Sequence, residues 1–247
     1  MDKLRKNRYL NQRCFIVATG PSIAKKDLSF LKNEFVISLN LCQLTLDLFN
    51  IIPEINIIAD KLQYPKYKEI FRELTFKKNI KKIIVASACE TFPEELKDKN
   101  TFFFPKKLQQ EIPDFSKNPI KDGFCRGKTV AFDAIQLAFY LGFKEVYILG
   151  MDFGKKYVWG KNGHSYEIEK NPKFKDVKFA TFKDKMINRG LPGHPEYWEY
   201  IQNCMKEAKK AFDEEGRIIL NDINSDLDIF DKIDIFKKFG GKNGKSD

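Results

Sequence analysis

The residues Gly20-Pro21-Ser22 have the features of a nucleotide site. They follow a short apolar run, Cys14 to Ala18, and precede a segment that is compatible with a helix, Ile23 to Asn33. Glycine allows a close approach of backbone to ligand, and proline fixes the turn. Ser22 adds a hydroxyl and a main-chain donor where a helix N-terminus carries partial positive charge. A strand–turn–helix junction of this kind binds phosphate, although an ordinary βα turn has the same outline.

Both histidines, His164 and His194, lie in or directly after an aperiodic segment, residues 154–193. This segment is rich in Lys, Gly, Asn and Pro and carries scattered aromatic residues. Loops of such length are usually functional covers or disordered excursions. Since the segment follows a predicted strand end, we expect it to form a lid over a substrate.

A second glycine-containing stretch, Gly127-Lys128-Thr129, has the ending of a phosphate-binding P-loop but not its beginning. The P-loop needs a glycine where this chain has Asp122. Thr129 is instead predicted to cap a helix over Val130–Leu141, whose exposed first amides could meet an anion with Arg126 nearby. Two histidines far apart in the sequence are weak evidence for a metal site, and none is predicted.

Short apolar segments alternate with helical ones along the chain. Near-continuous apolar strands are typical of a sheet that helices cover on both faces. The pattern predicts an α/β fold with an open, mostly parallel, doubly wound (Rossmann-like) sheet, whose ligands lie beyond the carboxyl ends of the strands. Strands are expected at Phe15–Thr19, Phe35–Leu39, Ile55–Ala59, Lys82–Ala86, Thr101–Phe104, Val146–Leu149 and Arg217–Leu220, and helices at Tyr64–Leu74, Thr129–Leu141 and Pro195–Glu214.

Length and composition favour one globular domain over residues 1–239, followed by a disordered tail at 240–247. The 247 residues are 43% hydrophobic, which is enough for a substantial core. No apolar run approaches the roughly 18 residues that span a bilayer, and the run after the basic N-terminus is too short for a signal peptide. Five cysteines without a CxxC pair indicate reduced thiols, so we expect a cytoplasmic protein.

The net charge of +10 favours anionic partners. Lysine dominates and is interleaved with acidic residues, arginine is scarce, and no nucleic-acid-binding motif occurs, so nucleic acid is not expected to be the partner. A basic enzyme that handles anionic donors, or that makes peripheral contact with an anionic inner-membrane face, fits the charge better. The sequence assigns no oligomeric state, and a homo-oligomer is left open.

The Gly20-Pro21-Ser22 turn, the helix Thr129–Leu141 and the stretch Gly142–Phe153 occur in an order that resembles a known family. It is similar to the bacterial sialyltransferases of lipooligosaccharide synthesis and to the related motility-accessory-factor transferases, which use other nonulosonic acids, within an MptE-like superfamily. In those proteins the helix leads into a strand that ends at the nucleotide site. The turn and the resemblance together assign nucleotide binding to Thr19, Gly20, Pro21, Ser22, Asn40, Asp60, Thr129, Gly150, Asp152 and Phe153. Asp152 could also bind a cation or only cap the next turn.

Two further matches imply catalytic residues. The segment Asn162–Tyr166 resembles one that carries a tyrosine bound to the leaving phosphate, and Gly193-His194 resembles a pair whose histidine is the general base. A histidine with a pKa of about 6.5 suits removal of a hydroxyl proton. A phenol can donate a hydrogen bond to the leaving phosphate without a metal. The resemblance therefore implies transfer of a sialic-acid-like sugar from a CMP donor to a glycan hydroxyl in lipopolysaccharide biosynthesis, with no cofactor. His164 is the alternative base.

The chain also departs from the sialyltransferase pattern. Asp60 stands where an asparagine lies near the donor, Gly154 replaces a second phosphate-binding tyrosine, and Val130 replaces a serine. A nonulosonic donor sugar is therefore expected, while the sequence leaves open whether that sugar is sialic acid. A pyrophosphokinase of the hydroxymethylpterin type ranks lower, because its His-Gly-Asp-Asn motif is absent. A non-catalytic accessory protein of polysaccharide synthesis is the third alternative.

Overall fold

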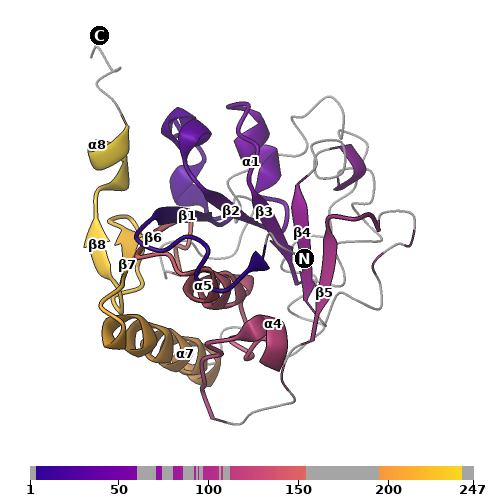
Figure 1. Cartoon of the computed structure of the whole chain (residues 1–247). Helices are drawn as coiled ribbons and strands as arrows, with labels where there is room; N and C mark the ends of the chain where they lie inside the picture. The colour runs from indigo at the N-terminus through magenta and orange to yellow at the C-terminus, as the bar shows by residue number, and fades with distance from the viewer. Residues whose placement is uncertain are drawn as a thin grey trace.

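A single parallel sheet of eight strands organises the chain (Figure 1). The structure, a computed structural model, describes residues 4–59, 71–73, 80–85, 92, 94, 97–105, 107, 112–153 and 195–240. All neighbouring strands pair in parallel, in the order β5-β4-β3-β2-β1-β6-β7-β8. The predicted α/β, doubly wound, Rossmann-like fold is confirmed. The strands are β1 (Arg13–Val17), β2 (Val36–Leu39), β3 (Ile55–Ile58), β4 (Lys81–Val85), β5 (Thr101–Phe104), β6 (Glu145–Leu149), β7 (Ile218–Asp222) and β8 (Asp231–Ile233).

The strand order reverses at β1. From β1 the chain adds strands outward as far as β5 and then returns to place β6 on the other side of β1. The register pairs Val17 of β1 with Leu149 of β6, so the carboxyl ends of these two strands lie side by side. Open α/β sheets bind ligands at such a reversal of strand order. A ligand site is therefore expected at the turns that follow β1 and β6.

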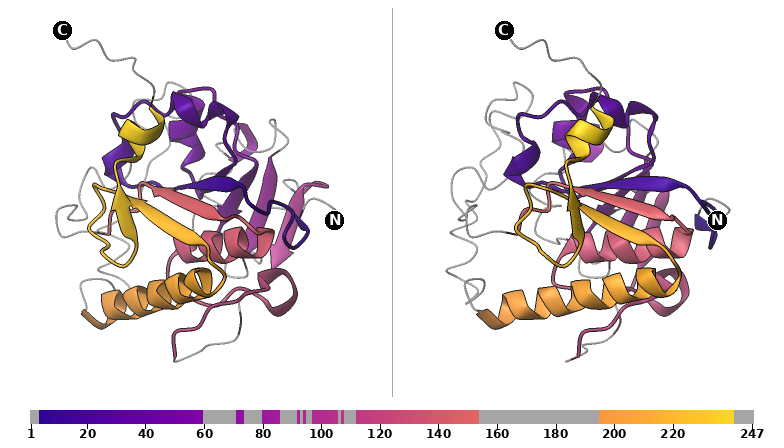
Figure 2. Two further views of the ribbon diagram at one scale, coloured as in Figure 1. Left: turned by 60° about the vertical axis from the view of Figure 1, so that its left-hand side comes forward. Right: turned by 90° about the vertical axis from the view of Figure 1, so that its left-hand side faces the viewer.

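One face of the sheet is covered by long helices. Helix α5 (Val130–Leu141) packs on β1, β2 and β3, and α7 (Pro195–Glu214) packs on both α5 and β7, with the short α4 (Pro119–Asp122) beside α5 (Figure 2). Almost every side chain of α5 is buried, as expected for a helix covered on both sides, whereas α7 is amphipathic. The bounds of α7 agree with the prediction, and Thr129 caps α5 as expected, its Oγ1 accepting a hydrogen bond from the Ala131 nitrogen at 3.3 Å.

Short elements cover the other face. They are η2 (Pro21–Ile23), η3 (Ser29–Asn33), α1 (Gln43–Asp47) and α8 (Ile235–Phe239), and they pack on a second, smaller apolar cluster. The helix expected from Ile23 to Asn33 is wrong, since two 3-10 turns replace it. Asp27 accepts a hydrogen bond from the Ser29 nitrogen at 2.8 Å, a local turn that competes with helix continuation.

Some expected elements lie wholly or partly outside the described residues. Of the helix expected at Tyr64–Leu74, only residues 71–73 are described. The lid 154–193 and residues 241–247 are not described. Sequence patterns did not predict α1, α4, α8 and β8, which have three to five residues each and are too short to show a period. No helix within the described ranges combines the length and the apolar character that crossing a bilayer requires.

Candidate functional site at the β1 and β6 ends

Two glycine turns are bonded to each other where β1 and β6 end. The Ala18 nitrogen donates to the Leu149 carbonyl at 2.8 Å, and the Gly20 nitrogen donates to the Gly150 carbonyl at 2.7 Å. A Cβ on Gly20 would lie 2.3 Å from the Gly150 oxygen, and one on Gly150 would lie 2.7 Å from the Ala18 oxygen. Gly150 also has a positive φ of 68°. Both positions therefore need glycine because backbone meets backbone there.

The carboxylate of Asp152 accepts two hydrogen bonds from Ser22. The Ser22 nitrogen donates to Asp152 Oδ2 at 2.9 Å, and the Ser22 hydroxyl donates to Oδ1 at 2.5 Å. The Asp152 side chain also lies against Gly20, where a Cβ would be 2.5 Å from Oδ2. The hydroxyl and the amide that the sequence offers to a ligand thus contact a buried protein carboxylate, with Asp152 only 5% exposed.

Two more carboxylates, Asp222 and Asp226, lie close to Asp152. Asp222 ends β7, and Asp226 donates its main-chain nitrogen to the Asp152 carbonyl at 2.9 Å. Burial raises the pKa of Asp152, the Ser22 hydrogen bonds oppose this, and the charges of Asp222 and Asp226 raise the pKa further. The edge of the sheet formed by β6 and β7 is therefore electronegative.

The β7 side of this edge is a feature that sequence reasoning missed. Ser225 donates its hydroxyl to the Met151 carbonyl at 2.6 Å and accepts a hydrogen bond from Asn221 Nδ2 at 2.8 Å. The available signal was the polar pair Asn221-Asp222 directly after an apolar strand. The strand was predicted to end at Leu220, whereas β7 continues through Asp222.

Asn40 joins the ends of β2 and β3. It has a positive φ of 49°, its nitrogen donates to the Ile57 carbonyl at 2.8 Å, and its Oδ1 accepts from the Ala59 nitrogen at 3.3 Å. The Asn40 carbonyl accepts from Asn56 Nδ2 at 3.3 Å. Asp60, the next residue after Ala59, lies outside the described residues.

The segment that leads into α5 docks on α7. The Tyr200 hydroxyl donates to the Arg126 carbonyl at 3.0 Å, and Lys128 Nζ lies 4.4 Å from the centre of the Tyr200 ring. The Arg126 and Lys128 side chains are exposed, and Thr129 is half-buried. The N-terminus of the twelve-residue helix α5 is thereby presented with two cations beside it.

Phe153 connects the end of β6 to the start of α7. Its ring packs edge-on against that of Trp198 with 5.7 Å between the ring centres, and its φ is 41°. The remaining described residues among the predicted nucleotide contacts are Thr19 and Pro21. Both are half-buried and belong to the turn after β1.

The predicted catalytic residues lie outside the described residues. These are His194, Tyr166 and the alternative base His164, together with Gly154. Pro195, which follows His194 in the sequence, begins α7. In the parts of the chain that the structure describes, no group of three or more His, Cys, Asp or Glu side chains is arranged to hold a metal ion.

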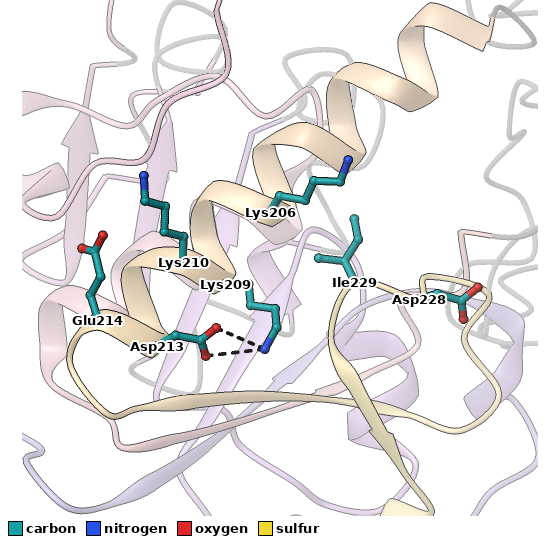
Figure 3. A pocket seen from close by; sticks show the side chains of 7 residues that line it. All are labelled: Lys206, Lys209, Lys210, Asp213, Glu214, Asp228 and Ile229. Carbon is teal, nitrogen blue, oxygen red and sulfur yellow. Dashed lines mark hydrogen bonds and ion pairs between the residues drawn. The ribbon is translucent and has the colours of Figure 1, made fainter.

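A shallow groove of about 640 Å³ lies between α7 and the segment that precedes β8 (Figure 3). The Lys209 ammonium pairs with Asp213 at 3.3 Å across its floor. Positive and negative side chains alternate around the groove, which takes no residue from β1, β2 or β6 and forms no part of the candidate site. Its lining residues are Lys206, Lys209, Lys210, Asp213, Glu214, Asp228 and Ile229.

A family model matches the part of the chain that contains both glycine turns. The family is described as 6-hydroxymethylpterin diphosphokinase MptE-like, and the match covers residues 1–157, more than half of the chain. The chain belongs to this MptE-like family. The matched region includes β1 through β6 and the Ser22–Asp152 pair, so the two bonded turns lie within the family's part of the chain, whereas the residues contributed by α7 and β7 lie beyond it. No curated protein sequence matches the chain.

A solved structure shares the fold of this MptE-like chain. The MAf glycosyltransferase from Magnetospirillum magneticum AMB-1 superposes with a TM-score of 0.56 at 14% identity, covering 93% of this chain and 35% of that one. This chain thus spans about a third of that protein's length. The sialyltransferase CstII from Campylobacter jejuni, in complex with cytidine-5'-monophosphate, gives a TM-score of 0.44 at 12% identity, covering 89% of this chain and 84% of CstII. The resemblance predicted from the sequence is confirmed for family and fold.

Proposed function

We propose that the protein is a glycosyltransferase that moves a nonulosonic, sialic-acid-like sugar from a CMP donor to a hydroxyl of a surface glycan. The observation that carries the proposal is the pair of bonded turns at the strand reversal, where Ser22 holds Asp152. The fold, shared with the MAf glycosyltransferase over 93% of this chain, supports it. The donor is the nucleotide sugar itself, and the reaction needs no further cofactor.

Asp152 suits recognition of hydroxyl groups. A carboxylate has about four lone-pair positions, and Ser22 uses two of them. The remaining lone pairs are acceptors for the hydroxyls of a ribose, whereas a phosphate placed against Asp152 would be repelled. The ribose of the donor therefore belongs beside Asp152, and its phosphate belongs at a positive group.

A positive group beside the strand ends is the start of α5. Its first amides, capped by Thr129, lie next to the exposed Arg126 and Lys128 side chains. The N-terminus of α5 and the carboxyl ends of the strands lie at the same edge of the sheet. Helix α5 begins at that edge and runs back to the opposite edge, where β6 begins. A nucleotide placed between Asp152 and the α5 N-terminus would have each of its groups next to a complementary one.

The transfer itself is assigned to His194 and Tyr166. The bond between the anomeric carbon and the phosphate oxygen breaks, CMP leaves, and a bond forms between that carbon and the acceptor oxygen. His194 takes the acceptor's proton, and the Tyr166 hydroxyl donates a hydrogen bond to the departing phosphate. We place the enzyme in the cytoplasm, in peripheral contact with the inner membrane, where a membrane-linked glycan acceptor would be available.

The family description favours a second candidate function. Members of the MptE-like family are described by 6-hydroxymethylpterin diphosphokinase activity, which would require ATP instead of a CMP donor. The absence of the His-Gly-Asp-Asn motif from the sequence ranks this activity below glycosyl transfer. A non-catalytic role in polysaccharide synthesis would leave both kinds of nucleotide unbound.

A thermal-shift panel of CMP, CDP, UDP, GDP and ATP, with and without Mg²⁺, separates these functions. A ligand that binds only the native state raises the melting temperature. We expect CMP to give the largest increase, with or without Mg²⁺. A large shift with ATP and Mg²⁺ alone would replace the transferase with the pyrophosphokinase, and no shift with any nucleotide would favour the accessory protein.

A further inference from the structure

Five exposed lysines gather on the layer of short elements, on the face of the sheet opposite α5 and α7. We call Lys25, Lys26, Lys32, Lys237 and Lys238 the lysine surface. They come from two segments that are far apart in the sequence, the η2–η3 segment and α8. Figures 1 and 2 show α8 beside the short helices above the sheet.

Aromatic packing fixes the two segments of the lysine surface together. The ring of Phe30 in η3 lies 6.0 Å from that of Phe236 and 6.1 Å from that of Phe239, both in α8. Lys26 Nζ lies 5.3 Å from the centre of the Phe236 ring, so a lysine of one segment lies over an aromatic ring of the other. The lysines are thus carried by one rigid layer.

The carboxylates of the same segments are engaged by other groups. Asp27 accepts from the Ser29 nitrogen at 2.8 Å, and hydrogen bonds to Ser29 are the main cause of its lowered pKa. Asp234 accepts from the Lys237 nitrogen at 2.8 Å, and Glu34 pairs with Arg13 at 2.6 Å. Within the described residues, none of the five lysines forms an ion pair with a carboxylate. Lys238 donates a hydrogen bond to the Tyr147 hydroxyl at 2.9 Å, so the other four lysines are the ones whose ammonium groups are available to a partner.

The outer surface of α7 has lysines at a similar density but a different balance. Lys209 pairs with Asp213 at 3.3 Å, and Glu214 pairs with Lys117 at 2.9 Å. Figure 3 shows the acidic and basic side chains of this groove interspersed. The lysine surface has five lysines against the carboxylates Asp27, Glu34 and Asp234, and Glu34 is already paired with Arg13, whereas the α7 groove has three lysines and three acids. Positive charge is therefore in excess on the lysine surface and not in the groove.

Exposed apolar side chains lie in the same layer as the lysine surface. Leu48 is 72% exposed and Ile52 is 54% exposed, and their neighbours Leu46 and Ile51 belong to the apolar cluster that also holds Ile235 of α8. Beyond α8 the sequence adds Lys242 and Lys245. Lysines combined with exposed aliphatic side chains suit the boundary between lipid headgroups and acyl chains.

We propose that the lysine surface docks on a bilayer of anionic lipids. Each lysine near such a surface raises the partition coefficient roughly fivefold at physiological salt, so the excess of lysines over carboxylates on this surface favours peripheral binding. Lysine acts as a point charge and needs no specific geometry of the phosphate, which fits a fluid lipid surface. Lys25 follows Ser22 by less than one turn of helix, so docking brings the candidate site close to the lipid headgroups.

The test is co-sedimentation of the full chain with vesicles of phosphatidylcholine alone and of phosphatidylcholine mixed with phosphatidylglycerol. We expect binding only to the mixed vesicles, and a decrease as salt rises from about 0.1 M to about 1 M. The double variant Lys26→Glu/Lys237→Glu should lower the partition coefficient by roughly thirtyfold or more. The matched control Lys206→Glu/Lys210→Glu makes the same change in net charge on α7 and should lower it much less.

Three results would overturn the proposal. One is a wild type that does not bind the mixed vesicles at low salt. Another is an α7 control that loses as much binding as the lysine-surface variant. Alternatively, single-stranded RNA could bind while vesicles do not, which would make nucleic acid the partner. Circular dichroism of both variants establishes that each is folded, and vesicle binding is independent of whether CMP is the donor.

Discussion

Ser22 donates two hydrogen bonds to the carboxylate of Asp152, which lies 130 positions further along the sequence. This contact ties the turn after β1 to the turn after β6 through side chains, in addition to the bond between the Gly20 nitrogen and the Gly150 carbonyl. Ser22 thereby fixes where a buried acceptor lies at the strand reversal. Because the carboxylate is buried, its hydrogen bonds contribute more to stability than bonds on the surface do.

Replacing Ser22 should destabilise the fold measurably. In Ser22→Ala the carboxylate keeps the main-chain hydrogen bond and loses the one from the hydroxyl. Hydrogen bonds to charged groups are worth about 1.5–3 kcal/mol, so we expect a loss of about 2 kcal/mol in the free energy of unfolding, measured by urea denaturation. Ser29→Ala also removes a hydroxyl that bonds a carboxylate, Asp27, but this carboxylate is fully exposed and water can replace the lost bond, so the variant should cost much less than Ser22→Ala. Equal costs for the two variants would contradict this account of the Ser22–Asp152 contact.

The raised pKa of Asp152 predicts a sign for the pH dependence of stability. The folded state binds this proton more readily than the unfolded state does. The contribution of Asp152 to stability therefore falls as pH rises from the ordinary value of 3.8 through the raised pKa. Asp152→Asn cannot titrate, so the stability of the wild type relative to this variant should decrease over that range, as measured by urea denaturation at several pH values.

Asp27 provides a control of opposite sign for this measurement. Its pKa is lowered by hydrogen bonding to Ser29, so its contribution is present above pH 3.8 and is lost as pH falls through the lowered value. Relative to Asp27→Asn, the wild type should therefore gain stability as pH rises. If both comparisons changed in the same direction, local electrostatics would not be their cause.

The sequence predicted the sheet well because its central strands are buried on both faces. Phe15–Val17 and Val146–Leu149 are continuous apolar runs, and a parallel sheet between helix layers requires such runs. Gly20, Ser22 and Asp152 were each predicted to lie at the site. Their contact was not predicted, because it depends on which strand becomes the neighbour of β1, and no local pattern carries that information.

Two other differences between the sequence-based prediction and the structure have local causes. Asp222 was missed because the polar end of β7 resembles a loop, although pairing of Asn221 with Ile148 and of Asp222 with Ile233 holds it in the sheet. The Ile23–Asn33 helix failed because Asp27 makes a turn with Ser29 where helix propensity alone would allow continuation.

Gly20 should tolerate no side chain. In Gly20→Ala the new Cβ would meet the Gly150 carbonyl oxygen at 2.3 Å, and backbone cannot move aside as a flexible side chain can. We expect a loss of about 3 kcal/mol or more in the free energy of unfolding. Gly216→Ala has open space around its Cβ but a positive φ of 64°, and should cost only about 1 kcal/mol. A Gly20→Ala protein as stable as the wild type would show that the turns are not packed in this way.

Replacing His194 tests the proposed chemistry directly. His194→Ala removes the general base, so turnover should fall by about two to four orders of magnitude, while CMP affinity changes little because the base acts on the acceptor hydroxyl. In the wild type the acid limb of the pH–rate profile should report one group with a pKa of about 6.5, and this limb should vanish in the alanine variant.

Tyr166→Phe should also lower turnover, because the leaving phosphate loses its hydrogen-bond donor, but it should keep the acid limb. If His194→Ala kept both its rate and its pH profile while His164→Ala lost them, His164 would be the base. If neither variant changed the profile, proton removal would not depend on histidine at all.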